Sequence, residues 1–416
     1  MAAKPTNWAG NVEFAARALR RPTTFEEFRE IVATGDRVRV LGSGHSFNRI
    51  ADTTGDLVVL DGLPRAVEVD SANGTVRVGA ATRFAELCPV LRRHGLALPN
   101  LPSTPHFTLA GAYATGTHGS GHTGGTLAAA VRSVELVTAD GETVTVSRGT
   151  DDHFEGTVVS LGSLGVVTAL TLETCPTFEV EQYVHEGLAW PAFPEDLTGV
   201  LGVAYSVSVF TDWSGPARVW VKRRVGDPPP DPTLLSGTRP ADGPRHPIEG
   251  MPTANATEQS GVPGPWDERL PHFRAGFVPS VGDELQSEYF VPAERAAEAA
   301  AALVELGPLL APVLRVSEVR TVAADPHWLS PAHGRDSVAF HFTWTSDARA
   351  VAGVLPRVEA ALAPFDVRPH WGKLSSIAPE ATSASYERLE DFRALLERFD
   401  PKGTFRNELI DRYFPR

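Results

Sequence analysis

The feature that most constrains the fold is a short apolar strand that runs directly into a glycine turn. The strand is predicted over residues 38–41, and residues 42–48 follow with the sequence Gly-Ser-Gly-His-Ser-Phe-Asn. A helix is predicted just before the strand over residues 25–32, where Thr24 can cap the first turn. The dinucleotide-binding fingerprint of a doubly wound sheet needs a third glycine and a helix after the turn. This sequence lacks both, so another cofactor fold is expected.

Two further stretches combine glycine with serine and threonine. Residues 108–121 lie between apolar segments and are predicted to form a loop, and residues 161–167 form a third glycine-rich turn before a strand at 168–173. Glycine allows backbone N–H groups to approach a phosphate closely. Each stretch alone would be read as a tight turn. Three of them in one region of mixed strands and helices favour a large dinucleotide.

Composition excludes several classes of protein. A chain of 416 residues is long enough for two domains. The formal net charge is −13 without a block of Lys and Arg, which argues against nucleic-acid binding. Cys88 and Cys175 form no C-x-x-C pair, so zinc or dithiol chemistry is not indicated. Because we also find no apolar signal core or membrane-spanning run, we expect a cytoplasmic protein that uses no metal ion and binds no membrane.

The second half of the chain alternates strands and helices. Strands are predicted at residues 286–290, 316–321 and 338–344, and helices at 292–306 and 347–363. The strand–helix–strand pattern therefore occurs twice. This predicts an antiparallel or mixed sheet with helices on one face, and with the first half it gives an α+β protein.

Side-chain alternation along these strands divides the sheet into two faces. Phe340, Phe342 and Trp344 point to one face, which we expect the helices to cover. The opposite face carries polar side chains from three strands: Gln286, Glu288, Glu318, Arg320, His341 and Thr343. Such a face can simply meet water. The same mixture, which contains no lysine, is also what a floor that binds hydroxyl groups requires.

Three motifs together resemble those of the vanillyl-alcohol-oxidase-type flavoproteins. They are the turn at residues 42–48, the Gly-Thr-His-Gly-Ser-Gly stretch at 116–121, and His-Trp-Gly-Lys at 370–373. Within that family the sequence is most similar to the alditol oxidases, which are relatives of the sugar-1,4-lactone oxidases. The resemblance implies a two-domain FAD-binding fold: an FAD domain over residues 1–180, a substrate-binding cap over 181–369, and a segment at 370–416 that returns to the FAD domain.

The resemblance also implies the cofactor and the residues that hold it. FAD is expected to be bound covalently through its 8α position to His45, and only once, because neither Cys88 nor Cys175 matches the second attachment site of doubly linked members. The implied cofactor-binding residues are Gly42, Ser43, Gly44, His45, Ser46, Ser103, Gly111, Thr115, Gly116, Thr117, His118, Gly119, Ser120, Gly165, Val166, His370 and Lys373.

Substrate contacts are implied in the same way. Glu318 and Arg320 match the pair that holds the terminal diol of the substrate, and Lys373 matches a lysine beside the reacting carbon and the flavin. These three are the expected catalytic residues. The remaining contacts to a polyol are expected from Ser103, Gln286, His341 and Thr343. Glu288 receives no direct role, although a second acid close by could support Arg320.

The sequence therefore predicts a probably monomeric enzyme that oxidises the terminal primary alcohol of an alditol, such as xylitol or sorbitol, and reduces molecular oxygen to hydrogen peroxide. Two alternatives stay open at this point. A sugar-1,4-lactone oxidase or dehydrogenase would share the glycine turn and the His-Trp-Gly-Lys motif. A flavin-binding or carbohydrate-binding protein without turnover would share the polar sheet face.

Overall fold

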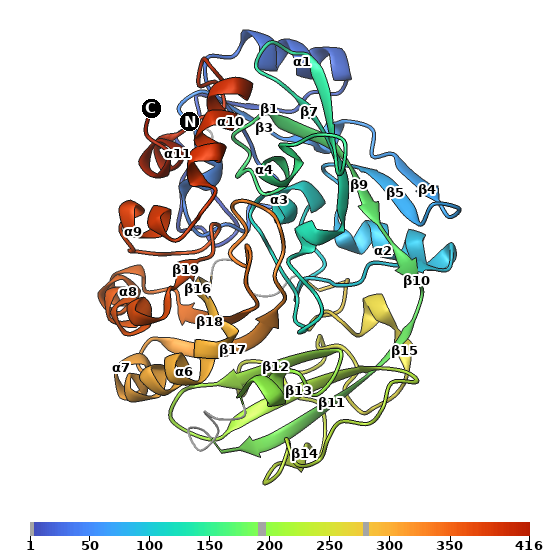
Figure 1. Cartoon of the computed structure of the whole chain (residues 1–416), viewed down its shortest axis with the longest axis vertical. Coiled ribbons are helices and arrows are strands. Elements are labelled where there is room, and N and C mark those ends of the chain that lie inside the picture. The colour runs from blue at the N-terminus through green and yellow to red at the C-terminus, as the bar shows by residue number, and fades with distance from the viewer. Residues whose placement is uncertain (1–3, 190–196, 278–282) are drawn as a thin grey trace.

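The computed structural model describes residues 4–189, 197–277 and 283–416. Figure 1 shows the N-terminal segments, in blue and cyan, beside the C-terminal segments, in red, at one end of the molecule. The green to orange segments fill the other end, where the largest sheet lies. The two ends of the chain therefore build one part of the protein together.

The predicted strand and glycine turn belong to a small parallel sheet in the N-terminal part. Its strands are β1 (Ala18–Arg20), β3 (Asp56–Val58) and β2 (Val38–Val40), with β3 in the middle. The helix predicted before β2 is confirmed as α1 (Phe25–Thr34), and the Thr24 side chain accepts a hydrogen bond from the Glu27 backbone at 3.1 Å. Residues 42–48 follow β2 as a turn, as predicted.

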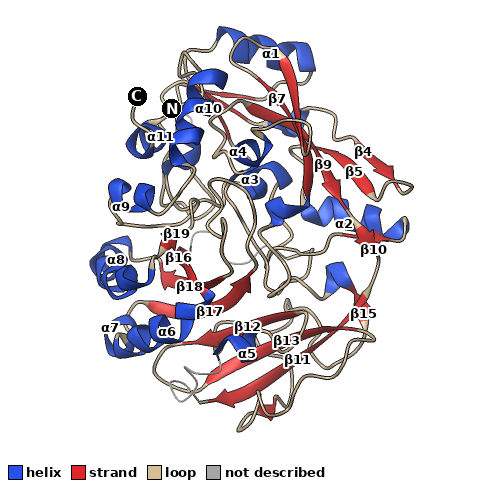
Figure 2. Cartoon of the chain, viewed as in Figure 1, coloured by secondary structure: helices blue, strands red, loops and turns tan. Residues whose placement is uncertain are grey.

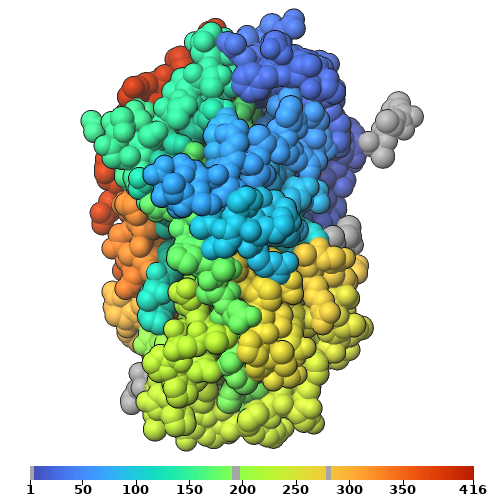
Figure 3. Space-filling view, turned by 90° about the vertical axis from the view of Figure 1, so that its right-hand side faces the viewer, coloured from blue at the N-terminus to red at the C-terminus, as the bar shows by residue number. Residues whose placement is uncertain are grey.

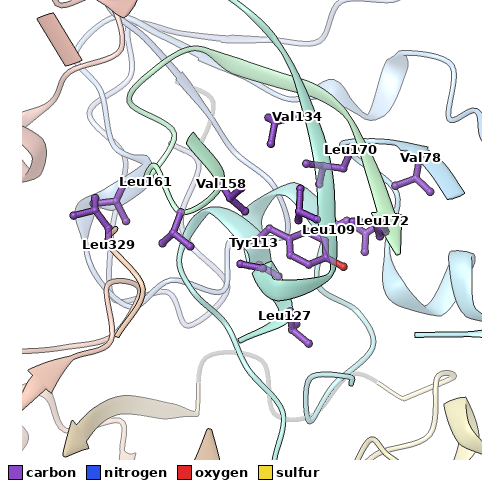
Figure 4. Packing of buried hydrophobic residues seen from close by; sticks show 14 of the residues in the cluster. Val78, Leu109, Tyr113, Leu127, Val134, Val158, Leu161, Leu170, Leu172 and Leu329 are labelled. Carbon is purple, nitrogen blue, oxygen red and sulfur yellow. The ribbon is translucent and has the colours of Figure 1, made fainter. Parts of the chain in front are cut away.

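A five-stranded antiparallel sheet completes the N-terminal part. Its order is β4 (Val67–Asp70), β5 (Thr75–Gly79), β9 (Val166–Glu173), β7 (Val131–Val137) and β8 (Thr143–Ser147). The helices of this part are α2 (Phe84–Arg93), α3 (Leu109–Ala114) and α4 (Phe154–Val158). Figure 4 shows Leu109 and Tyr113 of α3 packed beside Val134 of β7 and Leu170 of β9 in one apolar core. This core fixes the position of the segment that follows α3.

The loop predicted over residues 108–121 is partly wrong, because α3 occupies its first half. Leu109, Ala112 and Tyr113 are buried on one side of this helix and supply the apolar contacts that stabilise it. Gly111 is accommodated within the single α-helical segment. The glycine and threonine content of the stretch concealed a helix of only 6 residues.

The largest sheet, which is antiparallel throughout, lies in the other part of the molecule. Among the described residues its order is β14 (Arg239–Pro240), β11 (Glu179–Leu188), β13 (Ala217–Arg224), β12 (Ser206–Thr211), β17 (Leu314–Val322), β18 (Ser337–Thr345), β16 (Glu284–Pro292) and β19 (Arg368–Pro369), and β15 (Gly264–Pro265) pairs with β11. A separate short pair joins β6 (Leu96–Ala97) and β10 (Cys175–Pro176). The antiparallel alternative of the sequence prediction is therefore confirmed.

Helices cover one face of this sheet, as predicted (Figure 2). They are α6 (Ala296–Glu305) and α8 (Ala348–Leu362), with the shorter α5 (Leu197–Leu201) and α7 (Gly307–Leu310). Phe340, Phe342 and Trp344 are fully buried in the same apolar cluster as residues of α6 and α8. The alternation of side chains thus leaves the polar residues of β16, β17 and β18 on the face away from the helices.

The loops on the far side of the sheet connect it to the N-terminal part. Figure 3 shows the yellow segment that precedes β16 directly below the light-blue segment around α2. Arg92 of α2 makes ion pairs with Glu268 at 2.5 Å and Asp267 at 3.5 Å in this contact. Short 3-10 helices lie at Arg49–Ala51 (η1), Leu60–Gly62 (η2), Leu127–Ala130 (η3), Trp266–Glu268 (η4), Ala293–Arg295 (η5) and Ala363–Phe365 (η6).

The C-terminal segment returns to the N-terminal part. It contains α9 (Pro379–Ala384), α10 (Leu389–Phe399) and α11 (Glu408–Tyr413). The Asn407 side chain donates to the carbonyls of Arg49, Ile50 and Asp52 at 3.1, 3.0 and 2.9 Å. The boundaries predicted at residues 180 and 369 remain predictions. Along the chain, the five-stranded sheet ends at Glu173 and the large sheet begins at Glu179. No described helix has both the length and the apolar character needed to cross a membrane.

Arg39 of β2 joins three segments that are far apart in the sequence. Its side chain is 4% exposed, and its guanidinium donates at 2.8 Å to the carbonyls of Leu161, Gly162 and Phe405. A fourth donation goes to the carbonyl of Ile50. One buried arginine therefore ties the first glycine turn to the third and to the C-terminal segment.

We predict that Arg39→Met destabilises the protein because it leaves these buried carbonyls without donors. Each such loss costs about 1–3 kcal/mol, so the unfolding free energy should fall by about 3 kcal/mol or more. The measurement is thermal and denaturant unfolding monitored by circular dichroism. Arg21→Met is the matched control, because Arg21 forms an exposed ion pair with Asp61 that is worth about 0–1 kcal/mol. Equal stability of the two variants would contradict the prediction.

Candidate active site

One cavity of about 410 Å³ lies between the glycine turns and the polar face of the large sheet. That volume is typical of small-molecule and cofactor sites. The polar sheet face therefore lines a cavity and is not an ordinary solvated surface. The predicted residues that line it are Gly42, Ser43, Gly44, His45, Ser46, Ser103, Gly111, Thr115, Thr117, His118, Gly165, Gln286, Glu318, Arg320, His341, Thr343, His370 and Lys373.

Four residues predicted to bind the cofactor are not part of the cavity lining: Gly116, Gly119, Ser120 and Val166. The Ser120 hydroxyl donates instead to the Val207 carbonyl. Gly116 and Gly119 lie where a side chain would collide with Pro331 and Asn100, respectively. Val166 begins β9 and is buried in an apolar cluster. The structure thus gives each of these four residues a packing role.

The turn that carries His45 is held by both ends of the chain. The Trp8 backbone donates to the Gly44 carbonyl at 2.8 Å, and the Phe47 backbone donates to the Gly372 carbonyl at 2.7 Å. The Trp8 ring stacks on the imidazole of His45 with ring centroids 4.7 Å apart. Gly44 has a φ of +70°, which favours glycine. These contacts fix the position of the imidazole.

The imidazole of His45 is a neutral ring with a free nitrogen. Burial, with a smaller contribution from the charge of Lys373, lowers the pKa of His45 to about 3. Its Nδ1 atom is buried and has no hydrogen-bond partner within the protein. Phe107 packs edge-on against the ring at a centroid distance of 4.6 Å. The side chain is therefore uncharged, immobilised and available to a ligand.

The strand register aligns the polar residues of the sheet floor in rows. His341 on β18 lies directly opposite Glu288 on β16 and Glu318 on β17, so the imidazole stands between two carboxylates. In the next row, Thr343 lies opposite Gln286. The His341 Nε2 atom is 3.2 Å from the Thr343 hydroxyl. The floor is therefore one continuous set of hydrogen-bonding groups.

Glu288 is the charged centre of this floor. Its carboxylate is 3.0 Å from His118 Nε2, 2.6 Å from the Arg320 guanidinium and 3.5 Å from His341 Nδ1. Burial opposes its ionisation, but the charges of His118 and Arg320 outweigh burial and hold the pKa of Glu288 well below its usual range. An ionised Glu288 balances the positive charge of Arg320. The support for Arg320 that the sequence suggested is thus a direct contact.

Arg320 also contacts the two predicted substrate residues on either side of the cavity. It donates to the Ser103 hydroxyl at 3.3 Å, and its Nε atom is 3.6 Å from Glu318. Burial raises the pKa of Glu318, but the charge of Arg320 has the larger opposite effect, so the pKa of Glu318 lies well below its usual range. Ser103, Glu318 and Arg320 are therefore brought together as an ionised and hydrogen-bonded group.

Lys373 reaches the same floor from the segment after β19. Its ammonium donates to the Gln286 side-chain carbonyl and lies 5.0 Å from the centre of the Phe47 ring. Burial lowers the pKa of Lys373 to about 8. His370, three residues earlier, is neutral because burial lowers its pKa to about 3, and its Nδ1 accepts from the Gly372 backbone at 3.0 Å.

Several site residues were not predicted from the sequence. Trp8, Phe107 and His272 line the cavity, and Lys222 lies behind His272. The first three come from irregular segments, where no periodicity shows which way a side chain points. His118 was predicted to contact the cofactor, and its contact with Glu288 was not foreseen. A buried lysine within the predicted strand around 218–222 was the one available signal, because lysine is rarely buried without a partner.

Comparisons with known proteins agree with this arrangement. A family of FAD binding domains matches residues 16–147, and the D-arabinono-1,4-lactone oxidase family matches residues 283–413. An alditol oxidase of a Streptomyces species is 51% identical over 415 residues, which cover 99% of each chain. This chain belongs to the alditol oxidase family of vanillyl-alcohol-oxidase-type flavoproteins.

More distant relatives share the fold. An L-gulono-1,4-lactone dehydrogenase of Mycobacterium tuberculosis is 30% identical over 444 residues, which cover 98% of each chain. The crystal structure of a cholesterol oxidase from Brevibacterium sterolicum has a TM-score of 0.80 at 13% identity and covers 99% of this chain and 97% of its own. The latter likeness concerns the fold alone.

The residues of the cavity fit FAD, the cofactor of this family. At Gly42 a side chain would collide with Thr108, so only glycine lets the backbone pass at this point of the lining. The buried hydroxyls of Thr104 and Thr108, both in the lining, have no hydrogen-bond partner within the protein. These groups can bind the polar parts of the cofactor, and the free nitrogen of His45 faces the same cavity.

Proposed function

We propose that this protein is an FAD-dependent oxidase that converts the terminal primary alcohol of an alditol, such as xylitol or sorbitol, to the aldehyde and reduces molecular oxygen to hydrogen peroxide. The observation that carries the proposal is the polar floor of Ser103, Glu318 and Arg320, which shares one cavity with the His45 turn. The 51% identity to an alditol oxidase supports the same substrate class. A cytoplasmic, monomeric enzyme without a metal ion is proposed on the sequence arguments above.

The floor suits a polyol because it contains both acceptors and donors. An alditol has many hydroxyl groups, and a buried hydroxyl without a partner costs about 1–3 kcal/mol. The Glu318 carboxylate only accepts hydrogen bonds, and the Arg320 guanidinium only donates them. A terminal diol placed between them can donate to the first and accept from the second. Gln286, His341 and Thr343 extend this set to the next hydroxyl groups.

Two cations stabilise the oxygen of the reacting alcohol. When bound, FAD supplies the hydride acceptor and passes the electrons to oxygen. The ammonium of Lys373 and the guanidinium of Arg320 then stabilise negative charge on the alcohol oxygen as its proton leaves. Glu288 keeps Arg320 in place without contacting the substrate floor from above, since all its polar contacts are to His118, Arg320 and His341. The chain thus positions substrate and charge, and the cofactor performs the redox step.

We predict that the purified enzyme consumes oxygen with xylitol or sorbitol and forms one peroxide per oxygen. Glu318→Ala should raise KM for xylitol by about 10- to 100-fold with FAD still bound, because a hydrogen bond to a charged group is worth about 1.5–3 kcal/mol. Oxygen-electrode and peroxide assays measure both. Faster turnover of L-gulono-1,4-lactone than of xylitol would favour the lactone alternative, which the match of residues 283–413 keeps in view. Unchanged kinetics of Glu318→Ala would refute the substrate floor.

Activity should depend on the protonation of Lys373. Because its pKa is lowered to about 8, the ammonium is present below pH 8 and is lost as the pH rises through that value. We therefore predict that kcat/KM for xylitol falls above about pH 8. Lys373→Arg keeps its charge, so this decline should disappear in its profile even if its rate is lower. A rise of kcat/KM through pH 8 in the unchanged enzyme would instead identify Lys373 as the proton acceptor.

We further propose that FAD is attached covalently to His45 through its 8α position and has no second attachment. The neutral, fixed imidazole with its free Nδ1 supports the first part. Cys88 and Cys175 are free thiols outside the cavity lining, which supports the second.

Acid precipitation tests the attachment. We predict that the yellow colour stays with the precipitate of the unchanged enzyme and of His94→Ala, which alters an exposed histidine. The precipitate of His45→Ala should be colourless, and any FAD bound by this variant should appear in the supernatant. Release of FAD from the unchanged enzyme would disprove the link.

A further inference from the structure

Behind the substrate floor, a chain of buried side chains leads from Glu318 into the neighbouring strand. The His272 Nε2 atom is 2.7 Å from the Glu318 Oε1 atom, and the Lys222 ammonium is 3.1 Å from His272 Nδ1. All three residues are buried, with exposed fractions of 5% for Glu318 and His272 and 1% for Lys222. Lys222 does not line the cavity, so any effect it has on substrate must pass through His272.

The hydrogen-bond partners determine which nitrogen of His272 carries the proton. Burial lowers the pKa of His272 to about 4, so the ring is neutral at neutral pH and has one N–H group. Glu318 is ionised and can only accept, which requires the N–H at Nε2. The Nδ1 atom is then an acceptor, and Lys222 donates to it. Lys222 also donates to the Leu270 carbonyl. Each hydrogen bond in the chain therefore points toward Glu318.

His272 is fixed in other directions as well. Its ring lies edge-on against Phe210 and Trp220, with centroids 5.5 and 5.3 Å away. Its backbone N–H donates to the Ser103 carbonyl at 2.9 Å. One residue thus contacts Glu318 through its side chain and Ser103 through its backbone. These are the two groups on opposite sides of Arg320 that the proposed function assigns to the substrate hydroxyls.

Burial of Lys222 is costly unless it serves the neighbouring residues. Burial lowers its pKa to about 7, and both of its hydrogen-bond partners, Leu270 and His272, are uncharged. A charged group with neutral partners in a protein interior is unfavourable. An apolar side chain would fill the same space at less cost but could not donate to His272. The donation to Nδ1 is therefore the specific property that lysine contributes here.

We propose that Lys222 and His272 are positioning residues for polyol binding: Lys222 fixes the tautomer of His272, and His272 holds the carboxylate of Glu318 and the backbone of Ser103. This proposal rests on the proposed function for the identity of the substrate. Held in this way, Glu318 has one oxygen committed to His272. Its other oxygen has only the longer contact of 3.6 Å with Arg320 and can accept from a substrate hydroxyl.

Kinetics of the FAD-loaded enzyme with xylitol test the role of His272. His272→Leu removes the donor to Glu318, so KM should rise about tenfold or more while kcat stays within about threefold, as expected for loss of a binding contact. His272→Gln places a side-chain N–H near the position of Nε2 and should restore most of the affinity. An unchanged KM in His272→Leu, with FAD bound, would overturn the proposal.

Lys222→Met tests the second link, because methionine matches the length of lysine but cannot donate. Its KM should rise in the same direction as that of His272→Leu. Ser317→Ala is the matched control: Ser317 is the neighbour of Glu318 on β17, and its hydroxyl accepts from Trp213 on the helix-covered face. Ser317→Ala removes a buried hydrogen bond and should lower the melting temperature without changing KM. An equal rise of KM in Ser317→Ala would show that general destabilisation explains the effect.

A double-variant comparison isolates the coupling to Glu318. In the background of Glu318→Gln, the carboxylate is absent, so His272→Leu should raise KM by much less than it does in the unchanged enzyme. Equal, independent effects in both backgrounds would place the action of His272 elsewhere and overturn the proposal.

One measurement does not depend on the substrate. Long-range proton–nitrogen NMR spectra of histidine-labelled holoenzyme distinguish the two neutral tautomers, and the His272 signal is assigned by its loss in His272→Gln. We expect the Nε2–H tautomer in the unchanged enzyme and a shifted or mixed signal in Lys222→Met. A Nδ1–H tautomer in the unchanged enzyme would overturn the proposal. Failure to oxidise xylitol together with the expected tautomer would instead overturn only the proposed function.

Discussion

The contact between Glu288 and Arg320 is the interaction on which the site depends. Arg320 is buried on the face that carries the predicted substrate contacts, and a guanidinium there is tolerated only with a compensating charge. Glu288 provides that charge at 2.6 Å from the adjoining part of the sheet floor. With Arg320 neutralised from behind, its remaining donors can be directed at Ser103 and at ligands. The polar floor is thus stable without substrate because its charges are already balanced within the protein.

The same pairing links the two parts of the molecule. His118 follows α3 in the N-terminal part, whereas Glu288 lies on β16 of the large sheet, and their side chains meet at 3.0 Å. The ring of His118 also packs against Phe290 of the same strand. A buried charged contact of this kind is sensitive to displacement, because its strength depends on distance in a medium of low dielectric constant. The relative placement of the cofactor segment and the substrate floor is therefore fixed by chemistry as well as by apolar packing.

The sequence predicts those features that repeat with a regular period. Alternation along residues 338–344 correctly separates Phe340 and Phe342 from His341 and Thr343, because a strand places neighbours on opposite faces. The register between strands, which puts His341 opposite both Glu288 and Glu318, is not contained in any one strand.

Aperiodic segments defeat the same reasoning. His272 lies in an irregular segment, so nothing in its surroundings indicates that its ring reaches Glu318. The helix α3 was missed for a related reason: its stability comes from burying Leu109 and Tyr113 in a core assembled from distant strands, while its own composition suggests a loop. Site residues held by such long-range contacts become visible only once the fold is known.

The dependence of the His45 turn on the C-terminal segment has a consequence for the order of events during synthesis. Asn407 holds the carbonyls of η1, and Arg39 holds that of Phe405, so the turn lacks partners until the last part of the chain exists. Arg49 and Asn407 are 358 residues apart, a delay of roughly 20–70 s at about 5–20 residues per second. Throughout that interval the nascent N-terminal half exposes an unfinished pocket. Cofactor loading therefore belongs to the completed polypeptide, and a chain that stops short of residue 405 would leave the ribosome without a place to keep its flavin.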